Sequence, residues 1–367
     1  MIADSDKNHM LHCIDLAMRG EYSCKPNPRV GSIVVKNNEV LAEGWHRYAG
    51  QVHAEVDALD KAGESAQGAT LYVTLEPCSH HGRTAPCSDA IIKAGIRKVV
   101  FGMIDPNPQV AGAGISKLEA AGIEVLGPVL QEQCAALNPG FIKRMTSGLP
   151  YVRCKMAMSL DGRTAMASGE SKWISGPESR EDVQRWRARS GAIITGIGSV
   201  LADDPSLNVR LDEFDNVQPI RVVCDSALQI PAQAKTLQHA GQVLLATAEP
   251  KSFAATSELA AEIECKSFDS GTGKTDLKAL LAYLAAEKEC NEVLIEAGSR
   301  LAGAFIELGL VDELLVYVAP KLLGHQGHPL LTIHGMDRIK DQIALEFVDV
   351  SLLGKDCRIR SRILKKQ

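Results

Sequence analysis

The 367-residue sequence has no apolar run near the roughly 20 residues that a membrane-spanning helix needs. Its first ten residues, MIADSDKNHM, lack the apolar core of a secretory signal peptide. Basic residues are not in excess: 40 lysines and arginines stand against 45 aspartates and glutamates, and the net charge is −5. A protein that binds nucleic acid through its phosphates is expected to be basic. These absences predict a cytoplasmic protein that binds neither membrane nor nucleic acid.

The ten cysteines are scattered along the chain and do not form the compact pattern of a disulfide framework. Without an export signal, most of them are expected to be reduced and buried as small apolar side chains. Internal repeats and low-complexity segments are also missing. The length and the 45 % hydrophobic content predict two domains, each with a core of its own.

Helical and strand patterns alternate through both halves of the chain, which predicts α/β domains with largely parallel sheets covered on both faces. The pattern restarts around SGLPYV (147–152), so we place the domain boundary near Gly148 and divide the chain into 1–147 and 148–367. The first helix, 5–19, is expected to be capped by Ser5 or Asp6. Its expected apolar stripe is Met10, Leu11, Ile14 and Met18. The other expected helices are 53–63, 86–95, 115–121, 131–145, 177–188, 276–288 and 299–308. The expected strands are 30–35 and 40–45 as a hairpin, 70–75, 98–103, 123–126, 151–160, 191–197, 219–225, 242–248, 292–298 and 313–320.

Two stretches combine metal ligands with an acid: HAEVDAL (53–59) and PCSHHGRTAPC (77–87). The stripe Val52, Val56, Leu59 and Ala62 is expected to face the core, which leaves His53 and Glu55 off it, in the first helical turn. Side chains there can reach a ligand beyond the helix end. Cys87 follows Pro86, a residue favoured at the start of a helix. A helix start lowers a thiol pKa, and the thiolate is the form that binds zinc.

One histidine and two cysteines give three protein ligands, which is the catalytic arrangement because the fourth position of zinc stays open for water. That water becomes hydroxide near neutral pH, and Glu55 can shuttle its proton. H-x-E followed by P-C is typical of zinc-dependent nucleobase deaminases. Two residues usually separate their cysteines, whereas eight, SHHGRTAP, do so here. His80 or His81 could therefore be a ligand instead, or both could line a loop.

HAEVDAL, TLEPCSHHGRTAPC, DPNPQVAGAG (105–114) and PNPRVG (26–31) closely resemble the deaminase half of the bifunctional riboflavin-biosynthesis enzymes, a family with the long cysteine spacing. The resemblance runs essentially from end to end. It implies a cytidine-deaminase-like three-layer domain over 1–147, with His53, Cys78 and Cys87 as the ligands of Zn²⁺ and Glu55 as the catalytic proton shuttle. It also implies hydrolytic deamination of 2,5-diamino-6-ribosylamino-4(3H)-pyrimidinone 5′-phosphate.

Three segments of the second half have features of binding loops. KMAMSLDGRTAMASGESKWIS (155–175) is a strand that enters a Gly- and Ser-rich loop, which could be functional or an ordered surface loop. IEAGSRLAGAF (295–305) and TGIGSVLADDP (195–205) are strand-to-glycine-to-helix turns, whose free N–H groups suit a phosphate. None of them, nor VAGAGISK (110–117), contains the complete G-x-G-x-x-G of a Rossmann site.

KMAMSLDGRTA, SGESKWI, SVLADDPSLNVR and EAGSRLAGAF resemble the reductase half of the same family, which is similar in fold to dihydrofolate reductase. The resemblance implies that 148–367 is an NADPH-dependent domain that reduces the ribosyl group to a ribityl group by hydride transfer to the anomeric carbon. By motif, it assigns NADPH contacts to Ala157, Trp173, Ser199, Asp203, Ser226, Gly298, Ser299, Arg300, Leu301, Ala302, Gly303 and Ala304. It assigns substrate contacts to Ser171, Arg187, Leu207, Arg210 and Glu296.

Arg187 and Arg210 suit the substrate phosphate because a guanidinium group can bind it bidentately. Asp161 is a candidate acid for opening the sugar, or else shapes a turn. The resemblance further implies a homodimer or higher oligomer through the reductase domains, where strand ELLVYVAP (313–320) could pair.

Two functions of other classes share some of these features. Enzymes that edit bases in nucleic acid also use H-x-E and P-C, but the acidic charge argues against that class here. A binding module with a structural zinc would require a fourth protein ligand, and Glu55 would then have no role in any activity.

Overall fold

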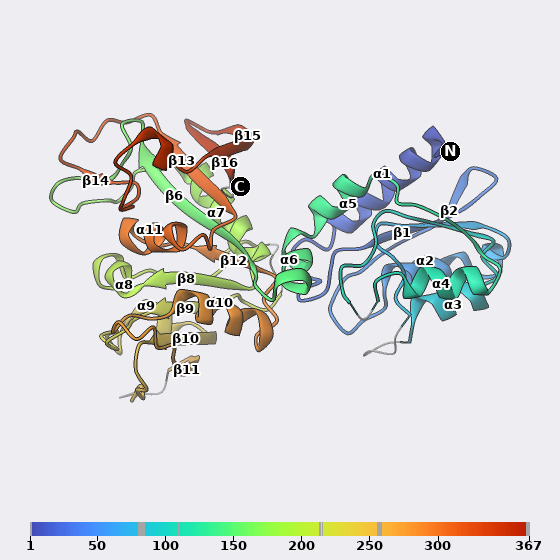
Figure 1. Cartoon of the computed structure of the whole chain (residues 1–367), viewed down its shortest axis with the longest axis horizontal. Helices are drawn as coiled ribbons and strands as arrows, with labels where there is room; N and C mark the ends of the chain where they lie inside the picture. The colour runs from blue at the N-terminus through green and yellow to red at the C-terminus, as the bar shows by residue number, and fades with distance from the viewer. Residues whose placement is uncertain are drawn as a thin grey trace. The chain divides into compact units, whose positions relative to one another are not determined.

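A computed structural model describes residues 2–79, 85–108, 110–212, 214, 216–254 and 259–364. Contacts within the chain divide it into two compact units, Met1–Gly148 and Leu149–Gln367. Figure 1 labels the helices and strands of both units. Among the described residues, no helix is both long enough and apolar enough to cross a membrane.

The first unit is a three-layer α/β/α domain around a five-stranded sheet of order β2-β1-β3-β4-β5. Strand β1 is antiparallel to β2 and β3, whereas β3, β4 and β5 are parallel. The strands are β1 (Gly31–Lys36), β2 (Glu39–Trp45), β3 (Thr70–Val73), β4 (Lys98–Phe101) and β5 (Glu124–Leu126). One face packs against α2 (Ala54–Ala62), α3 (Cys87–Lys93) and α4 (Ala113–Ala120). The other packs against α1 (Asp4–Met18), α5 (Gln131–Leu137) and α6 (Pro139–Ser147) (Figure 1). The expected cytidine-deaminase-like layering is confirmed.

The hairpin of β1 and β2 forms as predicted, because Asn37 and Asn38 both adopt positive φ, 53° and 64°. Two residues with positive φ make the type I′ turn that fits the twist of a hairpin. The single helix expected at 131–145 is wrong: it breaks at Asn138 into α5 and α6. Pro139 has no N–H for the helical ladder and forces the residue before it out of helical geometry.

Helix α1 buries a face that overlaps only in part with the one expected, since Met10 and Ile14 pack in the core and Leu11 and Met18 do not. Its N-cap is Ala3, whose N–H donates to the Asp6 carboxylate, so the expected cap at Ser5 or Asp6 is wrong. Leu11 and Met18 are 47 % and 40 % exposed. The buried apolar residues are Met10, Cys13, Leu16 and Ala17. The helical period allows neighbouring stripes, and packing against β1 and β3 selects this one.

The second unit contains a nine-stranded sheet of order β11-β10-β9-β8-β12-β6-β13-β16-β15. The strands from β11 to β13 in this order are parallel, and β16 and β15 extend the sheet antiparallel. They are β6 (Tyr151–Ser159), β8 (Ala192–Gly196), β9 (Ile220–Cys224), β10 (Gly241–Thr247), β11 (Ala261–Ser267), β12 (Glu292–Ile295), β13 (Glu313–Ala319), β15 (Leu345–Leu353) and β16 (Asp356–Ile363). A short pair of β7 (Arg163–Ala165) and β14 (His328–Pro329) lies apart from the sheet.

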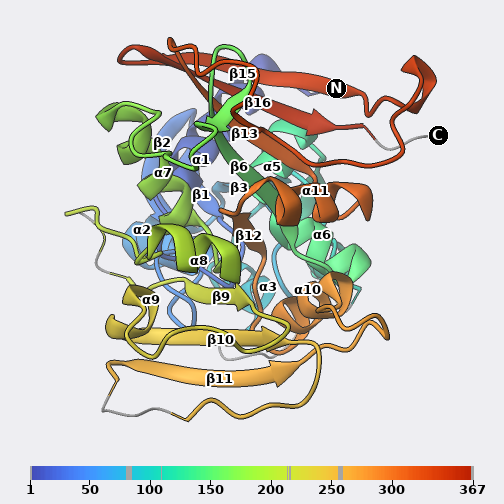
Figure 2. The ribbon, with the colours of Figure 1, turned by 90° about the vertical axis from the view of Figure 1, so that its left-hand side faces the viewer.

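Helices cover both faces of this sheet, as Figure 2 shows. One face carries α7 (Pro177–Arg189), α8 (Ile197–Asp203) and α9 (Lys235–Gln238). The other carries α10 (Leu277–Ala286) and α11 (Ser299–Glu307), which pack on the largest apolar cluster of the unit. The α/β architecture expected for a dihydrofolate-reductase-like domain is confirmed.

The strand proposed for pairing between subunits, 313–320, lies inside the sheet. It forms β13, which pairs with β6 on one side and with β16 on the other, so that expectation is wrong. The edge strands are β11 and β15, and neither was predicted. Their sequences mix charged and apolar residues and contain no continuous apolar run, so they lack the pattern of a strand that is buried on both faces.

Candidate active sites

Three potential metal ligands meet in the first unit. The Nδ1 atom of His53 lies 3.2 Å from the Cys87 sulfur and 3.7 Å from the Cys78 sulfur. All three ligand atoms lie within 4.8 Å of one another. His53 and Cys87 are 34 positions apart in the sequence, so the fold brings the three ligands together.

Two helix starts and one strand end position these ligands. His53 is the N-cap of α2, with extended backbone (φ −77°, ψ 161°), and Cys87 is the first residue of α3. Cys78 follows β3. The N–H of Cys87 donates to the Cys78 sulfur (3.3 Å), and the N–H of Ser88 donates to the Cys78 carbonyl (3.1 Å). The start of α3 therefore fixes both the sulfur and the backbone of Cys78.

The spacing of these atoms fits a zinc ion. Zinc binds thiolate at about 2.3 Å and imidazole nitrogen at about 2.0 Å, so nitrogen and sulfur on one tetrahedral ion lie about 3.5 Å apart. The observed distances of 3.2 Å and 3.7 Å bracket that value. No fourth ligand joins the cluster among the described residues, which fits a site with an open position. His80 and His81 lie outside the described residues.

The pKa values of the two thiols shift in opposite directions, and that of Cys87 is not lowered as expected for a helix start. The Cys78 pKa is lowered to about 4, chiefly by a hydrogen bond from Cys87 and further by His53, although burial opposes the shift. The pKa of Cys87 is raised, because this thiol donates that hydrogen bond. Cys87, at the start of α3, thus stabilises the thiolate form of Cys78 and not its own thiolate form.

Glu55 is buried beside the three ligands. Only 4 % of it is exposed, and burial raises the pKa of its carboxyl to about 7. The expected apolar stripe of α2 holds at Leu59 and Ala62, which pack in the core, but is wrong at Val52, which is 45 % exposed. Glu55 and Asp57 face inward instead. Glu55 points inward because it borders the ligand cluster, and Asp57 does so because it accepts from the Trp45 N–H and pairs with Arg47 and Lys61.

The segment PNPRVG also reaches this site. The Asn27 amide nitrogen lies 2.9 Å from Nε2 of His46, and the His46 ring packs edge-on against that of His53, with centroids 5.3 Å apart. Residues 26–31 and 53–87 thus border one another, as the separate motifs of a single site would.

In the second unit, the glycine turns predicted for phosphate binding lie at the carboxyl ends of parallel strands. Gly196 is the N-cap of α8 after β8, and Gly298 is the N-cap of α11 after β12. The two turns touch, because the Gly298 N–H donates to the Ser199 hydroxyl (3.2 Å). Ligands of open α/β sheets bind in such crevices.

The later residues of the predicted 298–304 loop point away from the carboxyl end of the sheet. Ala302 is fully buried in the apolar cluster. A Cβ on Gly303 would lie 1.9 Å from the Thr332 carbonyl, so the helix packs directly on that backbone. Of the predicted loop, residues 298–301 therefore lie nearest the carboxyl end of the sheet.

Arg187 and Glu296, both predicted to hold substrate, form a bidentate buried ion pair of 2.6 Å and 2.9 Å. Arg187 also donates to the Asn208 carbonyl (3.1 Å), next to Leu207, whose φ of 52° is unusual for a branched residue. Arg210 is exposed and donates to the Asn208 side chain (2.7 Å). The fold therefore gathers all four around one strand end.

Lys155 is a charged neighbour that the sequence reasoning missed. Parallel pairing of Ile295 with Cys154 sets Glu296 beside it. Burial lowers the pKa of Lys155, and the charge of Arg187 lowers it further, against the opposing effect of Glu296. A lysine within the largely apolar stretch CKMAM of β6 is the signal that could have revealed it.

The loop before α7 is tied down at several points. The Ser171 hydroxyl donates to Asp203 (3.4 Å), and Lys172 donates to the Asp203 carbonyl (3.0 Å). Trp173 is 66 % exposed, with the Arg180 guanidinium 4.7 Å from its ring centroid. Lys321 donates to the carbonyls of Trp173 and Ile174, both at 2.8 Å. Ser171, Trp173 and Asp203 thus belong to one ordered loop.

Ala157, Ser226 and Asp161 have different surroundings. Ala157 pairs with Tyr317 near the carboxyl end of β6. Ser226 accepts from the Thr275 N–H (3.0 Å), a structural contact. Hydrogen bonds from Ser159, Leu323 and Gly324 lower the pKa of Asp161 to about 2. Such a carboxylate stays ionised near neutral pH, which favours the turn-shaping role over that of an acid.

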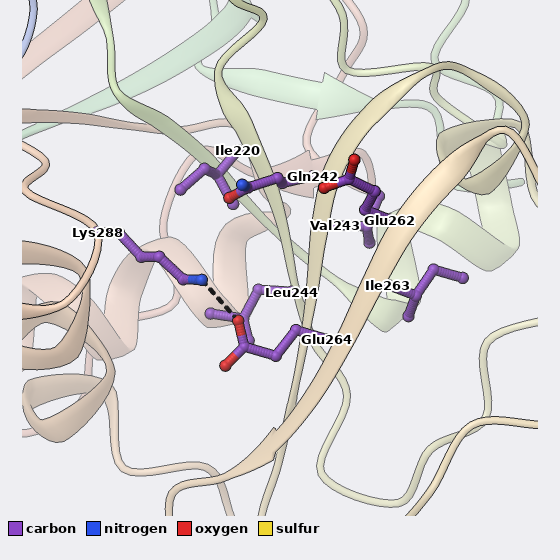
Figure 3. Close-up of a pocket in the computed structure, with 8 residues that line it drawn as sticks. All are labelled: Ile220, Gln242, Val243, Leu244, Glu262, Ile263, Glu264 and Lys288. Atoms are coloured by element: carbon purple, nitrogen blue, oxygen red, sulfur yellow. Dashed lines mark ion pairs between the residues drawn. The ribbon is translucent and has the colours of Figure 1, made fainter.

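A cavity of about 310 Å³ lies at the opposite, amino end of β9, β10 and β11 (Figure 3). Its lining includes the ion pair of Lys288 with Glu264, 2.8 Å apart. None of the predicted site residues lines it.

The geometry gives a candidate zinc site beside a buried carboxylate in one unit and a pair of glycine turns suited to a phosphate group in the other. A family model for the "Cytidine and deoxycytidylate deaminase zinc-binding region" matches residues 3–103, and one for the "RibD C-terminal domain" matches residues 150–359. The Escherichia coli riboflavin biosynthesis protein RibD is 45 % identical over 362 residues, which cover 96 % of this chain and 97 % of that protein. The Haemophilus influenzae protein of the same name is 44 % identical over 361 residues and 95 % of each chain.

Solved structures agree. Acinetobacter baumannii RibD is 46 % identical, covers 99 % of each chain and superposes with a TM-score of 0.91. A Thermotoga maritima deaminase/reductase is 32 % identical, covers 98 % of this chain and 99 % of that one, and gives 0.86. The chain belongs to the RibD family of bifunctional deaminases and reductases of riboflavin biosynthesis, which use zinc and NADPH.

Proposed function

We propose that the chain deaminates 2,5-diamino-6-ribosylamino-4(3H)-pyrimidinone 5′-phosphate in its first unit and reduces the ribosyl group of the product in its second. The observation that carries the first step is the cluster of His53, Cys78 and Cys87 beside the buried Glu55. The Thermotoga maritima relative is described as a diaminohydroxyphosphoribosylaminopyrimidine deaminase and 5-amino-6-(5-phosphoribosylamino)uracil reductase, which supports this substrate class. The corresponding domains would be 1–147 and 148–367.

In the deaminase site, His53, Cys78 and Cys87 would hold zinc. When bound, zinc supplies the positive charge that makes a water molecule acidic enough to react near neutral pH. The Glu55 carboxylate takes a proton from the attacking water and delivers it to the departing amino nitrogen, so that ammonia leaves and a carbonyl remains on the ring. Burial of Glu55 keeps bulk water from competing for that proton.

In the reductase site, NADPH would lie across the turns at Gly196 and Gly298 and would supply the hydride for the anomeric carbon. We assign its contacts to Ala157, Trp173, Ser199, Asp203, Ser226 and 298–301, because Ala302 and Gly303 pack into the protein and not toward this end of the sheet. The substrate would be held by Ser171, Arg187, Leu207, Arg210 and Glu296. Arg210 is exposed at this strand end and is suited to the phosphate, whereas Arg187 is already paired with Glu296 and orients that carboxylate.

The chain is further proposed to act in the cytoplasm as a homodimer through its reductase units. The apolar edge strand β15 supports this, because Leu345, Phe347, Val350 and Leu352 are 45 %, 71 %, 57 % and 80 % exposed. An exposed apolar edge of this kind is normally covered by a partner.

Glu55→Gln tests the deaminase proposal. It preserves size but cannot accept and return a proton, so ammonia release should fall by about 10²- to 10⁴-fold. One zinc per chain, measured by atomic emission, should remain. Asp57→Asn, also buried on α2 but in contact with Lys61 at 2.9 Å, is the matched control and should keep its activity. Unchanged ammonia release by Glu55→Gln would exclude Glu55 as the proton shuttle.

A further inference from the structure

Glu76 has a buried carboxylate that takes no part in the deamination steps above. Only 2 % of the residue is exposed. Its Oε1 accepts hydrogen bonds from the N–H groups of Gly114 (3.0 Å) and Ile115 (3.3 Å). Its Oε2 accepts from Gly112 (2.9 Å) and Asp105 (3.2 Å). Four backbone donors compensate for the burial of this charge.

All four donors belong to one segment, residues 105–115, which enters α4. Gly112 is the N-cap of this helix, so three of the N–H groups lie where a helix leaves its donors unpaired and where its dipole is positive. The N–H of Glu76 itself donates to the Met103 carbonyl (2.9 Å). One side chain and its own backbone thus tie the segment to the chain that leaves β3.

This connection lies directly next to a proposed zinc ligand, because Cys78 is two residues after Glu76. A Cβ on Gly114 would lie 1.9 Å from the Pro77 carbonyl, so the start of α4 is pressed against the backbone before Cys78. On its other side, the Cys78 carbonyl accepts from the Ser88 N–H at the start of α3. The backbone of Cys78 is therefore held between two helix starts.

We propose that Glu76 is a positioning residue for Cys78. Its carboxylate holds the start of α4, residues 112–115, against Pro77 and so fixes the Cys78 sulfur relative to His53 and Cys87. The inference rests on the zinc site of the proposed function and adds a residue that touches neither metal nor substrate. Partners of this indirect kind are worth about 10- to 100-fold in metal affinity or activity at known zinc sites.

Zinc release from the full-length protein to a chromophoric chelator tests this role. Glu76→Gln keeps the size of the side chain but replaces one accepting oxygen by an NH₂ group, which cannot accept from the two N–H groups that it faces. We expect release about 10- to 100-fold faster than from wild type, and a lower kcat for deamination. NADPH oxidation with the deaminated pyrimidine should be unchanged, since that site is in the other unit.

Asp6→Asn is the matched control. Asp6 is also a buried carboxylate of this unit, at 8 % exposure, and it accepts from the Tyr72 hydroxyl (2.8 Å) and the Ala3 N–H (3.1 Å). It lies on α1, on the opposite face of the sheet from α3 and α4. Each protein is assayed at the same number of degrees below its own unfolding temperature, so that differences in overall stability do not affect the comparison. Under these conditions Asp6→Asn should release zinc as slowly as wild type.

Gly114→Ala gives a second approach, because it pushes α4 away from Pro77 while leaving the carboxylate in place. It should also release zinc faster. Equal release rates for Glu76→Gln and Asp6→Asn would reduce Glu76 to a general stabiliser of the fold and overturn the proposal. A wild-type protein that binds no zinc would instead overturn the zinc site itself, and the positioning role with it.

Discussion

Glu55 and Glu296 are buried carboxylates whose surroundings shift their pKa values in opposite directions. Burial dominates at Glu55 and raises its pKa to about 7, a value that the charge of a bound zinc ion would lower. At Glu296, burial also acts upward, but the charges of Arg187, Lys155 and Arg210 outweigh it and lower the pKa below 4.5. The two environments suit a group that moves a proton and a group that stays anionic.

Glu296→Gln should destabilise the second unit by about 3–5 kcal/mol near neutral pH, because it leaves Arg187 buried without its counter-charge. Since the Glu296 pKa is lowered in the folded state, its contribution is complete above its ordinary value of 4.5 and is lost as the pH falls through the folded value. The stability difference between wild type and variant should therefore shrink in acid. Denaturant unfolding at several pH values measures it.

Glu181→Gln is the control, since Glu181 forms an exposed pair with Arg185 on the same helix as Arg187. It should change stability little at any pH. If the stability difference between wild type and Glu296→Gln persists at low pH, the ion pair is not the cause of that difference.

Sequence reasoning could predict site residues whose own side chains, in a recognisable motif, indicate their chemistry. His53, Cys78 and Cys87 span 35 residues and are typical metal ligands. Lys155 and Glu76 were missed because their roles depend on partners in other segments, which no local pattern connects to them. Glu296 is set beside Lys155 by strand pairing, and residues 105–115 are brought to Glu76 by the fold.

At the scale of strands and helices, the interior strands could be predicted from the sequence and the strands near the sheet edges could not. The parallel interior strands were predicted because burial on both faces requires continuous apolar runs. The strands β11, β15 and β16, which lie at or next to the sheet edges, lack such runs, and their place depends on pairing that no local pattern encodes. Helix faces were less predictable than helix positions, as the buried Glu55 side of α2 illustrates.

The loop before α7 is the element that we expect to control NADPH binding. Lys321→Met removes two charge-assisted hydrogen bonds to the carbonyls of Trp173 and Ile174. The freed loop must be ordered again when NADPH binds, so the KM for NADPH should rise by about tenfold for a cost near 1.4 kcal/mol. Steady-state kinetics with the deaminated pyrimidine measures this change.

Ammonia release by Lys321→Met should equal that of wild type, because the deaminase ligands lie in the other unit. Lys340→Met, which changes another exposed lysine of the second unit, is the control and should leave both activities unchanged. An unaltered KM for NADPH in Lys321→Met would show that the order of this loop does not affect cofactor binding.

At the scale of the whole molecule, each unit has its own sheet, core and candidate site. The zinc ligands all lie within Met1–Gly148, and the residues assigned to NADPH and to the reductase substrate all lie within Leu149–Gln367. Among the described residues, none of those assigned to one site belongs to the other unit. The two activities should therefore fail separately.

The proposed dimer predicts a concentration-dependent mass. Phe347→Lys places a charge on the 71 % exposed position of β15, and sedimentation velocity should show monomers where wild type shows dimers. Val217→Lys makes the same change at another exposed apolar position, 81 % exposed and away from β15, and should leave the dimer intact. Dimers of normal affinity in Phe347→Lys would place the interface elsewhere.

The most direct test of two independent sites is one assay of ammonia release and NADPH oxidation on zinc-chelated protein. With the diaminopyrimidine ribosyl phosphate, untreated protein should release ammonia and oxidise NADPH, and chelation should abolish both. When the deaminated pyrimidine is supplied, NADPH oxidation by the chelated protein should return to the untreated rate. Ammonia release that survives complete removal of zinc, or NADPH oxidation that does not return, would contradict a zinc deaminase and a separate reductase acting in sequence.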